Sequence, residues 1–525
     1  MSSNIGKGEE KTIPHLSKLP IFFVYPVIDL FAGPGGLGEG FASLVTDGKY
    51  SFKTLASFEC DPFAHKTLLL RHFFRNFEPY NQPKEYYKYL ASEIPFEDLE
   101  VTHKKQWEEA CKSVHKISLG TENHEEVFKL LTDKLKNHKK WVLVGGPPCQ
   151  AYSLVGRSRR TNDPDFEKDE KHFLYKEYLK IITDHRPPVF LMENVKGLLS
   201  AKVNKVPVIQ KIIKDLSHPK KAVGRSDNGL RYKLFSLSEH GEFKDEFNPS
   251  SFIVKAENYG IPQARHRMFI VGVRSDLNIV PKILNEQAAP SVKKIIGKMP
   301  KIRSRISKGI DSTKKWQQLL REVPKEQWVR TRSKSNDRLI ALLNKLNYAR
   351  LPSKPLSKRY NKPEEMQDWY YDENLNVLTL HEARSHMDTD LFRYLYASSF
   401  SKIFKISPKL SDFPEELLPA HKNVVAGKKG KMFADRFRVQ LPNRVSTTIT
   451  SHISKDGHYY IHYDPTQCRS LTVREAARLQ TFPDNYHFEG PRTSQYHQVG
   501  NAVPPYLAFQ IAEIIKDLLD RMPQN

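Results

Sequence analysis

The stretch that decides the fold reads Trp141-Val142-Leu143-Val144-Gly145-Gly146-Pro147-Pro148-Cys149-Gln150. Its first four residues are apolar and the next are turn formers, the pattern of a buried strand that ends in a tight turn. Two prolines then stiffen the backbone just before a cysteine. In an open parallel sheet, chemistry collects at the carboxyl ends of the strands. The pattern therefore predicts that Cys149 is a thiol nucleophile at such an end.

A second predicted strand ends in a carboxylate, because the apolar run 189–192 leads directly into Glu193-Asn194-Val195. A third strand, over 24–32, enters a glycine turn. A fourth, over 55–59, follows a helix that starts in those glycines, so this segment predicts a β-α-β unit. Together these strands predict an α/β fold with a doubly wound sheet. Further strands are predicted over 252–255 and 268–273, and helices over 106–114, 125–135, 471–480 and 506–519.

The glycine turn Gly33-Pro34-Gly35-Gly36-Leu37-Gly38 matches the pattern G-x-G-x-x-G. Glycines at these positions let the backbone approach a ligand and let the helix pack close to the strand. Glu59 follows at the end of the next strand, where an acid binds ribose hydroxyls. Taken alone, the pattern fits NAD, FAD or a turn that binds nothing.

The chain is strongly basic, with 83 Lys+Arg against 60 Asp+Glu and a formal net charge of +23. This balance favours a polyanionic partner over a merely solvated surface. Residues 275–465 hold 35 Lys+Arg and 20 Asp+Glu, and residues 293–359 hold 20 against 4. Aromatic residues interleaved with these charges are typical of nucleic-acid contact, and Trp316, Trp328, Tyr348 and Tyr360 lie within this stretch or directly after it. We expect this region to contact nucleic acid.

The four cysteines, Cys60, Cys111, Cys149 and Cys468, are far apart and form no CxxC pair. They predict neither a metal site nor a disulfide framework, and free thiols fit a reducing cytoplasm. The N-terminus lacks an apolar signal core, and the apolar stretch 21–32 is short and contains Asp29, so no membrane association is expected. Residues 1–20 are expected to form a flexible leader.

Seven blocks of the sequence resemble the cytosine-C5 DNA methyltransferases and stand in that family's order. One block would be a weak signal, but seven in order leave little room for coincidence. The blocks are Asp29-Leu30-Phe31-Ala32-Gly33-Pro34-Gly35-Gly36, Phe58-Glu59-Cys60-Asp61, Pro147-Pro148-Cys149-Gln150, Glu193-Asn194-Val195, 258–267, 471–480 and 498–505.

The resemblance implies a Rossmann-like doubly wound methyltransferase domain with S-adenosylmethionine as cofactor, and a second, smaller DNA-recognition domain. The residues it implies for the cofactor are Phe31, Gly33, Gly35, Gly36, Glu59, Pro148 and Asn501, with Glu59 on the ribose. Two features depart from the family. Cys60 stands where a bulky residue often covers the adenine, and the usual acidic block for the adenine amino group is not evident; its predicted location is 117–120.

The resemblance also implies the chemistry. Cytosine C5 is a poor nucleophile, but a thiolate that adds at C6 makes the ring an enamine whose C5 can attack a sulfonium methyl group. Cys149 supplies the thiolate, and Glu193 hydrogen-bonds the N3 edge, which requires a raised pKa. Asn194 holds the loop. Because the target atoms are hidden in a stacked duplex, the base must be extruded, and residues 150–153 are predicted to enter the helix.

Two arginines complete the predicted catalytic set. Gln263, Arg265 and Arg267 alternate, so in an extended segment they point to one side. Arg265 is expected to address the cytosine O2 and the phosphate of the flipped nucleotide. Arg267 either braces the site or touches the base directly, and the sequence leaves these alternatives equal.

The resemblance divides the chain into a catalytic domain over 21–275, a target-recognition domain over 276–465 and a C-terminal segment, 466–525, that returns to the catalytic domain. Phosphate contacts by Lys and Arg give affinity, and base contacts give specificity. The segment 444–451, Arg-Val-Ser-Thr-Thr-Ile-Thr-Ser, resembles the family's threonine-containing turn, with a plain strand as the equal alternative.

The expected function is methylation of double-stranded DNA at cytosine C5, by a monomer in the bacterial cytoplasm. The resemblance also implies a bacterial enzyme of a restriction–modification or related defence system, with a cognate restriction or defence protein as a possible partner. Two alternatives remain open. One is a tRNA cytosine-5 methyltransferase, against which the long basic insert argues. The other is a silent DNA-binding regulator, against which Cys149 and Glu193 argue.

Overall fold

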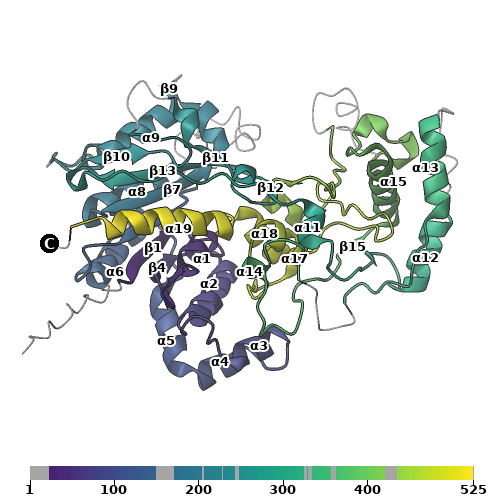
Figure 1. The fold of residues 1–525 in the computed structure, drawn as a ribbon, viewed down its shortest axis with the longest axis horizontal. Helices are drawn as coiled ribbons and strands as arrows, with labels where there is room; N and C mark the ends of the chain where they lie inside the picture. The colour runs from purple at the N-terminus through teal and green to yellow at the C-terminus, as the bar shows by residue number, and fades with distance from the viewer. Residues whose placement is uncertain are drawn as a thin grey trace, which may run out of the picture.

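The computed structural model describes residues 23–148, 171–203, 206–227, 229–242, 248–323, 328, 334–355, 362–419 and 434–523. Its centre is an eight-stranded sheet in the order β10-β13-β7-β6-β1-β4-β5, with β11 paired to β13 (Figure 1). The strands are β10 (Tyr232–Phe235), β13 (His266–Arg274), β11 (Ile253–Lys255), β7 (Val189–Val195), β6 (Val142–Gly145), β1 (Tyr25–Leu30), β4 (Phe52–Phe58) and β5 (Val114–His115).

The middle of this sheet is parallel. β1 pairs with β4 on one side and with β6 on the other, β6 pairs with β7, and β4 with β5. β13 and β10 form an antiparallel edge. Because the chain runs outward from β1 to β4 and later returns to the opposite side of β1 with β6, the strand order reverses at β1–β6. The predicted doubly wound α/β fold is therefore confirmed, and its crevice lies between the carboxyl ends of these strands.

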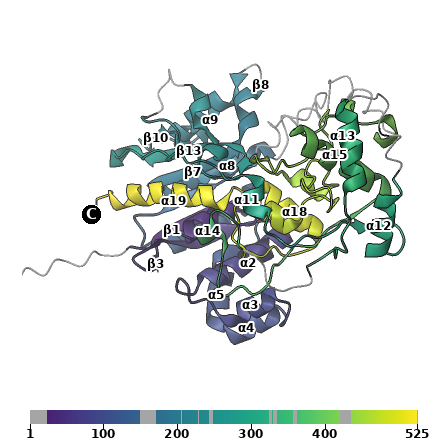
Figure 2. The same cartoon turned by 45° about the vertical axis from the view of Figure 1, so that its right-hand side comes forward.

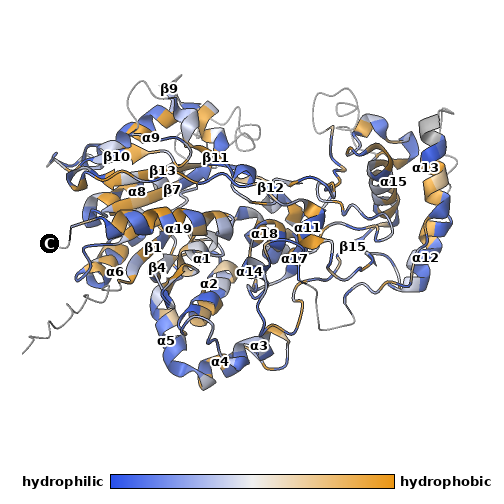
Figure 3. Ribbon diagram, viewed as in Figure 1, coloured by the Kyte–Doolittle hydropathy of each residue, from blue (hydrophilic) through white to orange (hydrophobic). Residues whose placement is uncertain are grey.

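Helices cover both faces of the sheet. α1 (Gly36–Ala42) and α19 (Pro505–Asp520) cover one face, and α6 (His124–Leu135), α8 (Lys171–His185) and α9 (Val208–Ser217) cover the other. Neighbouring residues of a strand point to opposite faces, so Val27 packs with α19 while Ile28 packs with the second layer. Figure 3 shows the predominantly hydrophobic strands between these helices.

A helical extension follows β4. It consists of α2 (Pro62–Arg75), α3 (Lys84–Leu90), α4 (Glu97–Thr102) and α5 (Lys104–Ser113). Asp61 caps α2, since its Oδ1 accepts hydrogen bonds from two backbone N–H groups of the first turn. The extension has its own small core around Phe73, and Leu375 and Val377 from the basic middle region pack into that core. The middle region therefore also contacts the helical extension that follows β4.

Most of the basic middle region builds a lobe beside the sheet. Its helices α12 (Thr313–Arg321), α13 (Lys334–Lys345) and α15 (Asp388–Phe404) lie at the right of Figure 1 and come forward in Figure 2. The sequence predicts aromatic side chains of this stretch at a nucleic-acid surface. For Trp316, Trp328 and Tyr348 that prediction is wrong, because all three are buried in the core of the lobe. Tyr360 lies outside the described residues.

A junction connects the sheet to the lobe. It contains α11 (Val292–Ile296), α17 (Val473–Leu479) and α18 (Arg492–Asn501). Two fully buried ion pairs, Arg469–Glu475 and Arg478–Asp484, brace it. Among the helices that the structure describes, none combines the length and the hydropathy that crossing a bilayer demands.

Candidate active site

A cavity of about 350 Å³ opens at the carboxyl ends of the parallel strands. We call it the strand-end cavity. Residues that follow β1, β4 and β6 line it, together with residues of β7 and the end of α18. Seven of the predicted site residues meet here: Phe31, Gly33, Glu59, Pro148, Glu193, Asn501 and Gly36.

The glycine turn is shaped by unusual backbone angles. Phe31, Gly33 and Gly35 have φ angles of 57°, 58° and 89°. In this left-handed region the backbone of any residue other than glycine is strained. A Cβ on Gly36 would lie 2.3 Å from the carbonyl oxygen of Val503, so only glycine lets the C-terminal segment come this close. The Gly33 N–H donates a 2.8 Å hydrogen bond to Glu59 Oε2 and fixes that carboxylate beside the turn.

Gly35 does not line the strand-end cavity. A Cβ at this position would lie 2.7 Å from Leu68 Cδ2 and 3.0 Å from the hydroxyl of Tyr486. The same hydroxyl donates a hydrogen bond to the carbonyl of Pro34. In this structure Gly35 therefore lets the turn pack against α2 and the C-terminal segment.

Asp29 is a buried carboxylate in the wall of the strand-end cavity. It is 1% exposed, and neither of its oxygens has a hydrogen-bond partner of ordinary geometry among the described residues. Burial, and then the nearby charge of Glu59, raise its pKa to about 8, although the Gly38 amide opposes the shift. An uncompensated buried carboxylate is costly, so the site is suited to a cation. The sequence held a signal for it, a charged residue within an apolar strand.

The region predicted to hold the adenine also belongs to this cavity. Ile117, Ser118 and Leu119 line it, as does Cys60. Apolar groups and a hydroxyl can surround a ring system, and neither an acid nor a large aromatic residue stands at these four positions.

Glu193 lies near the end of β7, beside Gly146 and Arg267. Arg267 Nε is 3.2 Å from Glu193 Oε1. A Cβ on Gly146 would lie only 2.8 Å from Glu193 Oε2, so this glycine makes room for the carboxylate. Burial raises the pKa of Glu193, and the charges of Arg267 and Arg265 oppose that shift. A carboxyl of this kind can hold a proton more readily than one in water.

Asn194 holds the turn after β6, as predicted, because its Nδ2 donates a 3.1 Å hydrogen bond to the carbonyl of Pro147. This contact fixes the backbone two residues before Cys149. Cys149 itself, residues 150–153 and the leader 1–20 lie outside the described residues.

Arg265 and Arg267, which the alternation places on one side, make different contacts. Arg265 stands between β12 (Gln263–Ala264) and β13, which pair with different strands. Its side chain is 1% exposed and donates hydrogen bonds to the carbonyls of Ile449 and Gly500. The guanidinium of Arg265 is thus buried and occupied by two backbone carbonyls in this structure, so it is not exposed for the contact with a base that the sequence predicts. Arg267 is the arginine beside Glu193.

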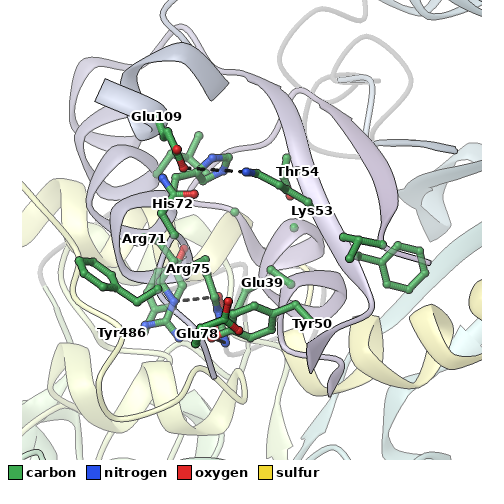
Figure 4. A pocket seen from close by; sticks show the side chains of 18 of the residues that line it. Glu39, Tyr50, Lys53, Thr54, Arg71, His72, Arg75, Glu78, Glu109 and Tyr486 are labelled. Atoms are coloured by element: carbon green, nitrogen blue, oxygen red, sulfur yellow. Dashed lines mark hydrogen bonds and ion pairs between the residues drawn. The ribbon is translucent and has the colours of Figure 1, made fainter. Parts of the chain in front are cut away.

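A second cavity, of about 250 Å³, lies between α1, α2 and β4 (Figure 4). At its centre, buried Glu39 accepts hydrogen bonds from Arg71 and Arg75. Burial acts to raise the pKa of Glu39, but the charges of the two arginines lower it to about 2. Arg71 also donates to Asn485 Oδ1. Glu39 is thus a counter-charge shared by two arginines, and the contacts tie α1 to α2 and to the C-terminal segment behind the glycine turn.

Comparison with known proteins places the chain in a family. The model described as "C-5 cytosine-specific DNA methylase" matches residues 91–219 and 234–517, most of the chain. The match includes the turn after β6, Glu193, both arginines and Asn501. The match starts after the glycine turn and Glu59. The assignment of these residues therefore rests on their sequence pattern and geometry alone.

Three similar proteins cover between 71% and 94% of the chain. The type II methyltransferase M.Bpa9945I of Bacillus paralicheniformis is 28% identical and covers 94% of this chain and 99% of its own. The type II methyltransferase M.DdeI of Desulfomicrobium norvegicum is 25% identical, covering 71% and 72%. The DNA (cytosine-5-)-methyltransferase M.ApeKI of Aeropyrum pernix is also 25% identical, covering 72% and 81%. With a family model matched over most of its length, the chain belongs to the C-5 cytosine-specific DNA methylase family and is a DNA (cytosine-5-)-methyltransferase.

Proposed function

We propose that the strand-end cavity binds S-adenosylmethionine. The residues present fit this cofactor on three counts. The glycine turn offers an uncrowded backbone, and Glu59 lines the cavity at the end of β4, the position of a ribose-binding acid. Asp29 is a buried carboxylate that lacks a partner among the described residues, and an ammonium group would supply its counter-charge. Phe31, Gly33, Gly36, Pro148 and Asn501 complete the walls, and Gly35 supports the turn from behind.

The bound cofactor supplies an electrophilic methyl group. The remaining chemistry falls to the protein. The Cys149 thiolate adds to C6 of an extruded cytosine, and the electron pair displaced from the C5–C6 bond makes C5 nucleophilic. After C5 has taken the methyl group, loss of its proton to a base and departure of the thiolate restore the aromatic ring. Asn194, through Pro147, fixes the backbone that leads to the nucleophile.

Glu193 and Arg267 are the groups we assign to the base. A protonated Glu193 donates to N3 and so favours attack at C6. Arg267, which lies 3.2 Å from Glu193, addresses the adjacent O2 edge. This assignment gives Arg267 the contact first expected of Arg265, because only Arg267 is both partly exposed and next to Glu193.

We further propose a type II modification enzyme of a bacterial restriction–modification or related defence system. Relatives such as M.Bpa9945I and M.DdeI carry the type II name. In this proposal a monomer acts on double-stranded DNA in the bacterial cytoplasm, and a cognate restriction or defence protein accompanies it. Residues 21–275 form the catalytic domain, 276–465 recognise the target, and 466–525 return to the catalytic domain.

The observation that carries the proposal is that Glu193 and six of the seven predicted cofactor residues, all but Gly35, line one cavity, at the turn that leads into Cys149. The test begins with bisulfite sequencing of DNA treated with the purified protein, which reports the modified site. Cys149→Ser should abolish methylation while leaving DNA binding largely intact. Turnover of this variant within tenfold of wild type would remove Cys149 from the mechanism.

A trapping experiment tests the covalent step directly. Duplex DNA with 5-fluorocytosine at the target should form a complex that survives denaturation, because fluorine cannot leave as a cation and the thiol stays attached. The same duplex with Cys149→Ser should give no such complex. A wild-type enzyme that methylates cytosine but never gives a shifted band would contradict the adduct.

A further inference from the structure

The buried side chain of Arg265 joins two distant parts of the chain. Its Nη1 donates a 2.7 Å hydrogen bond to the carbonyl of Ile449, and its Nη2 a 3.3 Å bond to the carbonyl of Gly500. Ile449 belongs to the threonine turn, by which we mean residues 446–451, and Gly500 lies in the last turn of α18. A guanidinium has a rigid fork of donors, so it fixes the separation of the two carbonyls that it binds.

The location of Arg265 also explains how a buried cation is tolerated. Burial lowers its pKa, as does the charge of Arg267, while Glu193 opposes both effects. The carbonyl end of a helix carries partial negative charge, and Gly500 presents such a carbonyl at the end of α18. The cation therefore gains from the same helix end that it holds in place.

Other contacts make the threonine turn and the end of α18 one unit. Gln263 Oε1 accepts from the Ile449 N–H, and its Nε2 donates to Gln480 Oε1. Gln480 in turn donates to the carbonyls of Val499 and Ala502. A Cβ on Gly500 would lie 2.3 Å from the backbone of the threonine turn, so there is no space for the two to slide.

This unit ends in the strand-end cavity. Asn501, Ala502 and Val503 follow Gly500 and line that cavity, and the carbonyl of Val503 touches the glycine turn at Gly36. A displacement of the threonine turn would therefore move the C-terminal wall of the cofactor site or break a hydrogen bond to a charged group. At the other end, the turn pairs with β12, and the hydroxyl of Tyr460 in the basic middle region donates to the carbonyl of Thr448 and accepts from the Thr450 N–H.

We propose that Arg265 is a positioning residue that links DNA binding at the threonine turn to closure of the cofactor cavity. This inference rests on the proposed function, since it assigns the cavity to S-adenosylmethionine and the turn to DNA. DNA and cofactor then raise each other's affinity. Linkage requires that the factor be the same in both directions, and such coupling typically amounts to about 5- to 150-fold.

The test measures binding without turnover. The dissociation constant of S-adenosylhomocysteine is determined with and without a saturating duplex that carries the site mapped by bisulfite sequencing. For the wild-type protein, the dissociation constant without DNA divided by that with DNA should be at least about five. We call this quotient the ratio. In Arg265→Lys it should fall below about twofold, because a single ammonium group cannot bridge both carbonyls. Arg274→Lys is the matched control, and its ratio should stay at the wild-type value. Arg274 ends β13, where it donates to the carbonyl of Arg186 and pairs with Asp276, away from the strand-end cavity and the threonine turn.

A second variant guards against misfolding of Arg265→Lys. Thr448→Val removes only the hydroxyl that donates to the carbonyl of Ala264, which loosens the turn from β12, and it too should lower the ratio. A wild-type ratio in Arg265→Lys or in a folded Thr448→Val would overturn the inference, as would a wild-type enzyme that methylates DNA but shows a ratio of one. A protein that methylates no cytosine would instead overturn the proposed function.

Discussion

Arg267 Nε lies 3.2 Å from Glu193 Oε1, and the two side chains are only 16% and 14% exposed. At this depth water screens the pair less than it would at the surface. Burial raises the pKa of Glu193, and the charge of Arg267 is the larger of the two influences that lower it again. The arginine therefore helps to set how readily the carboxyl holds a proton.

Removing the charge of Arg267 should move the pH dependence of methyl transfer to higher pH. In our proposal the protonated Glu193 is active, so the rate falls as pH rises through its pKa. Arg267→Gln removes a lowering influence, the pKa of Glu193 rises, and the falling limb shifts upward. Single-turnover rates across the pH range measure the limb, and Arg267→Lys, which keeps the charge, serves as the control. A downward shift in the Gln variant would refute the coupling.

Gly146→Ala should slow catalysis by displacing Glu193. The added methyl group would lie 2.8 Å from Glu193 Oε2, so the carboxylate must move. A misplacement of about 1 Å can cost roughly 100-fold, and we expect a fall in kcat of at least about tenfold with DNA affinity unchanged. Gly120→Ala is the control, because a Cβ there meets nothing within 4 Å. Equal kcat values in the two variants would show that catalysis does not depend on the exact position of the Glu193 carboxyl group.

The sequence predicts the sheet and the edge at which the site lies, because an apolar strand that ends in Cys or Glu is a local signal. It does not decide between Arg265 and Arg267. Alternation places residues on one side only within one strand, and here β12 ends before Arg265 and β13 begins after it. The contacts of Arg265 are with residues 449 and 500, far away in the chain. The role of Gly146 is likewise visible only once Glu193 is placed beside it.

Binding of S-adenosylmethionine should release a proton near neutral pH. The pKa of Asp29 is about 8 in the free protein, so this carboxyl is mostly protonated at pH 7 and must ionise to pair with a cation. Affinity should rise about tenfold per pH unit up to about pH 8 and then level off. Calorimetry in buffers of different ionisation enthalpy counts the proton. Asp29→Asn should bind more weakly, with no proton release.

Two ligands identify the group that Asp29 meets. S-adenosylhomocysteine keeps the ammonium group but lacks the sulfonium charge, and it should show the same release. 5′-Methylthioadenosine lacks the whole amino-acid portion and should show none. Proton release with methylthioadenosine would separate Asp29 from the ammonium group.

Glu39→Gln should destabilise the fold, because it removes the counter-charge that buried Arg71 and partly buried Arg75 share. Breaking such a buried cluster costs about 3–5 kcal/mol, measured by urea unfolding at neutral pH. The folded-state pKa of Glu39, about 2, lies below its ordinary value of 4.5. Its stabilisation is therefore full above about pH 4.5 and is lost as pH falls toward 2. The variant should lose this acid dependence.

The control for Glu39 is Glu109→Gln. Glu109 lines the same cavity, but it pairs with Lys53 at 3.9 Å and both side chains are largely exposed. Such a pair contributes little, so stability should hardly change. If both variants lost equal stability, the buried cluster would not be the cause.

Four lysines in and just after α11, Lys293, Lys294, Lys298 and Lys301, should divide into two classes in their contribution to DNA binding. Lys294 pairs with Glu364 at 3.2 Å, and Lys301 with Asp464 at 3.0 Å. Lys293 and Lys298 are exposed, and among the residues the structure describes neither has an ion-pair partner. Each phosphate that a lysine neutralises on duplex DNA adds about 0.9 to the slope of log affinity against log salt.

Replacing Lys293 and Lys298 with Gln should therefore flatten that slope by up to about two units and weaken all sequences alike. Replacing Lys294 and Lys301 should change it much less, because each lysine already has a carboxylate and exchanges one partner for another on binding. Titrations of labelled duplex at several salt concentrations compare the two double variants. If replacing Lys294 and Lys301 flattened the slope as much as replacing Lys293 and Lys298, the carboxylates that pair with Lys294 and Lys301 would have to move away when DNA binds. If neither double variant changed it, α11 would be a solvated face, and the DNA path would have to be sought near Arg436 and Arg444.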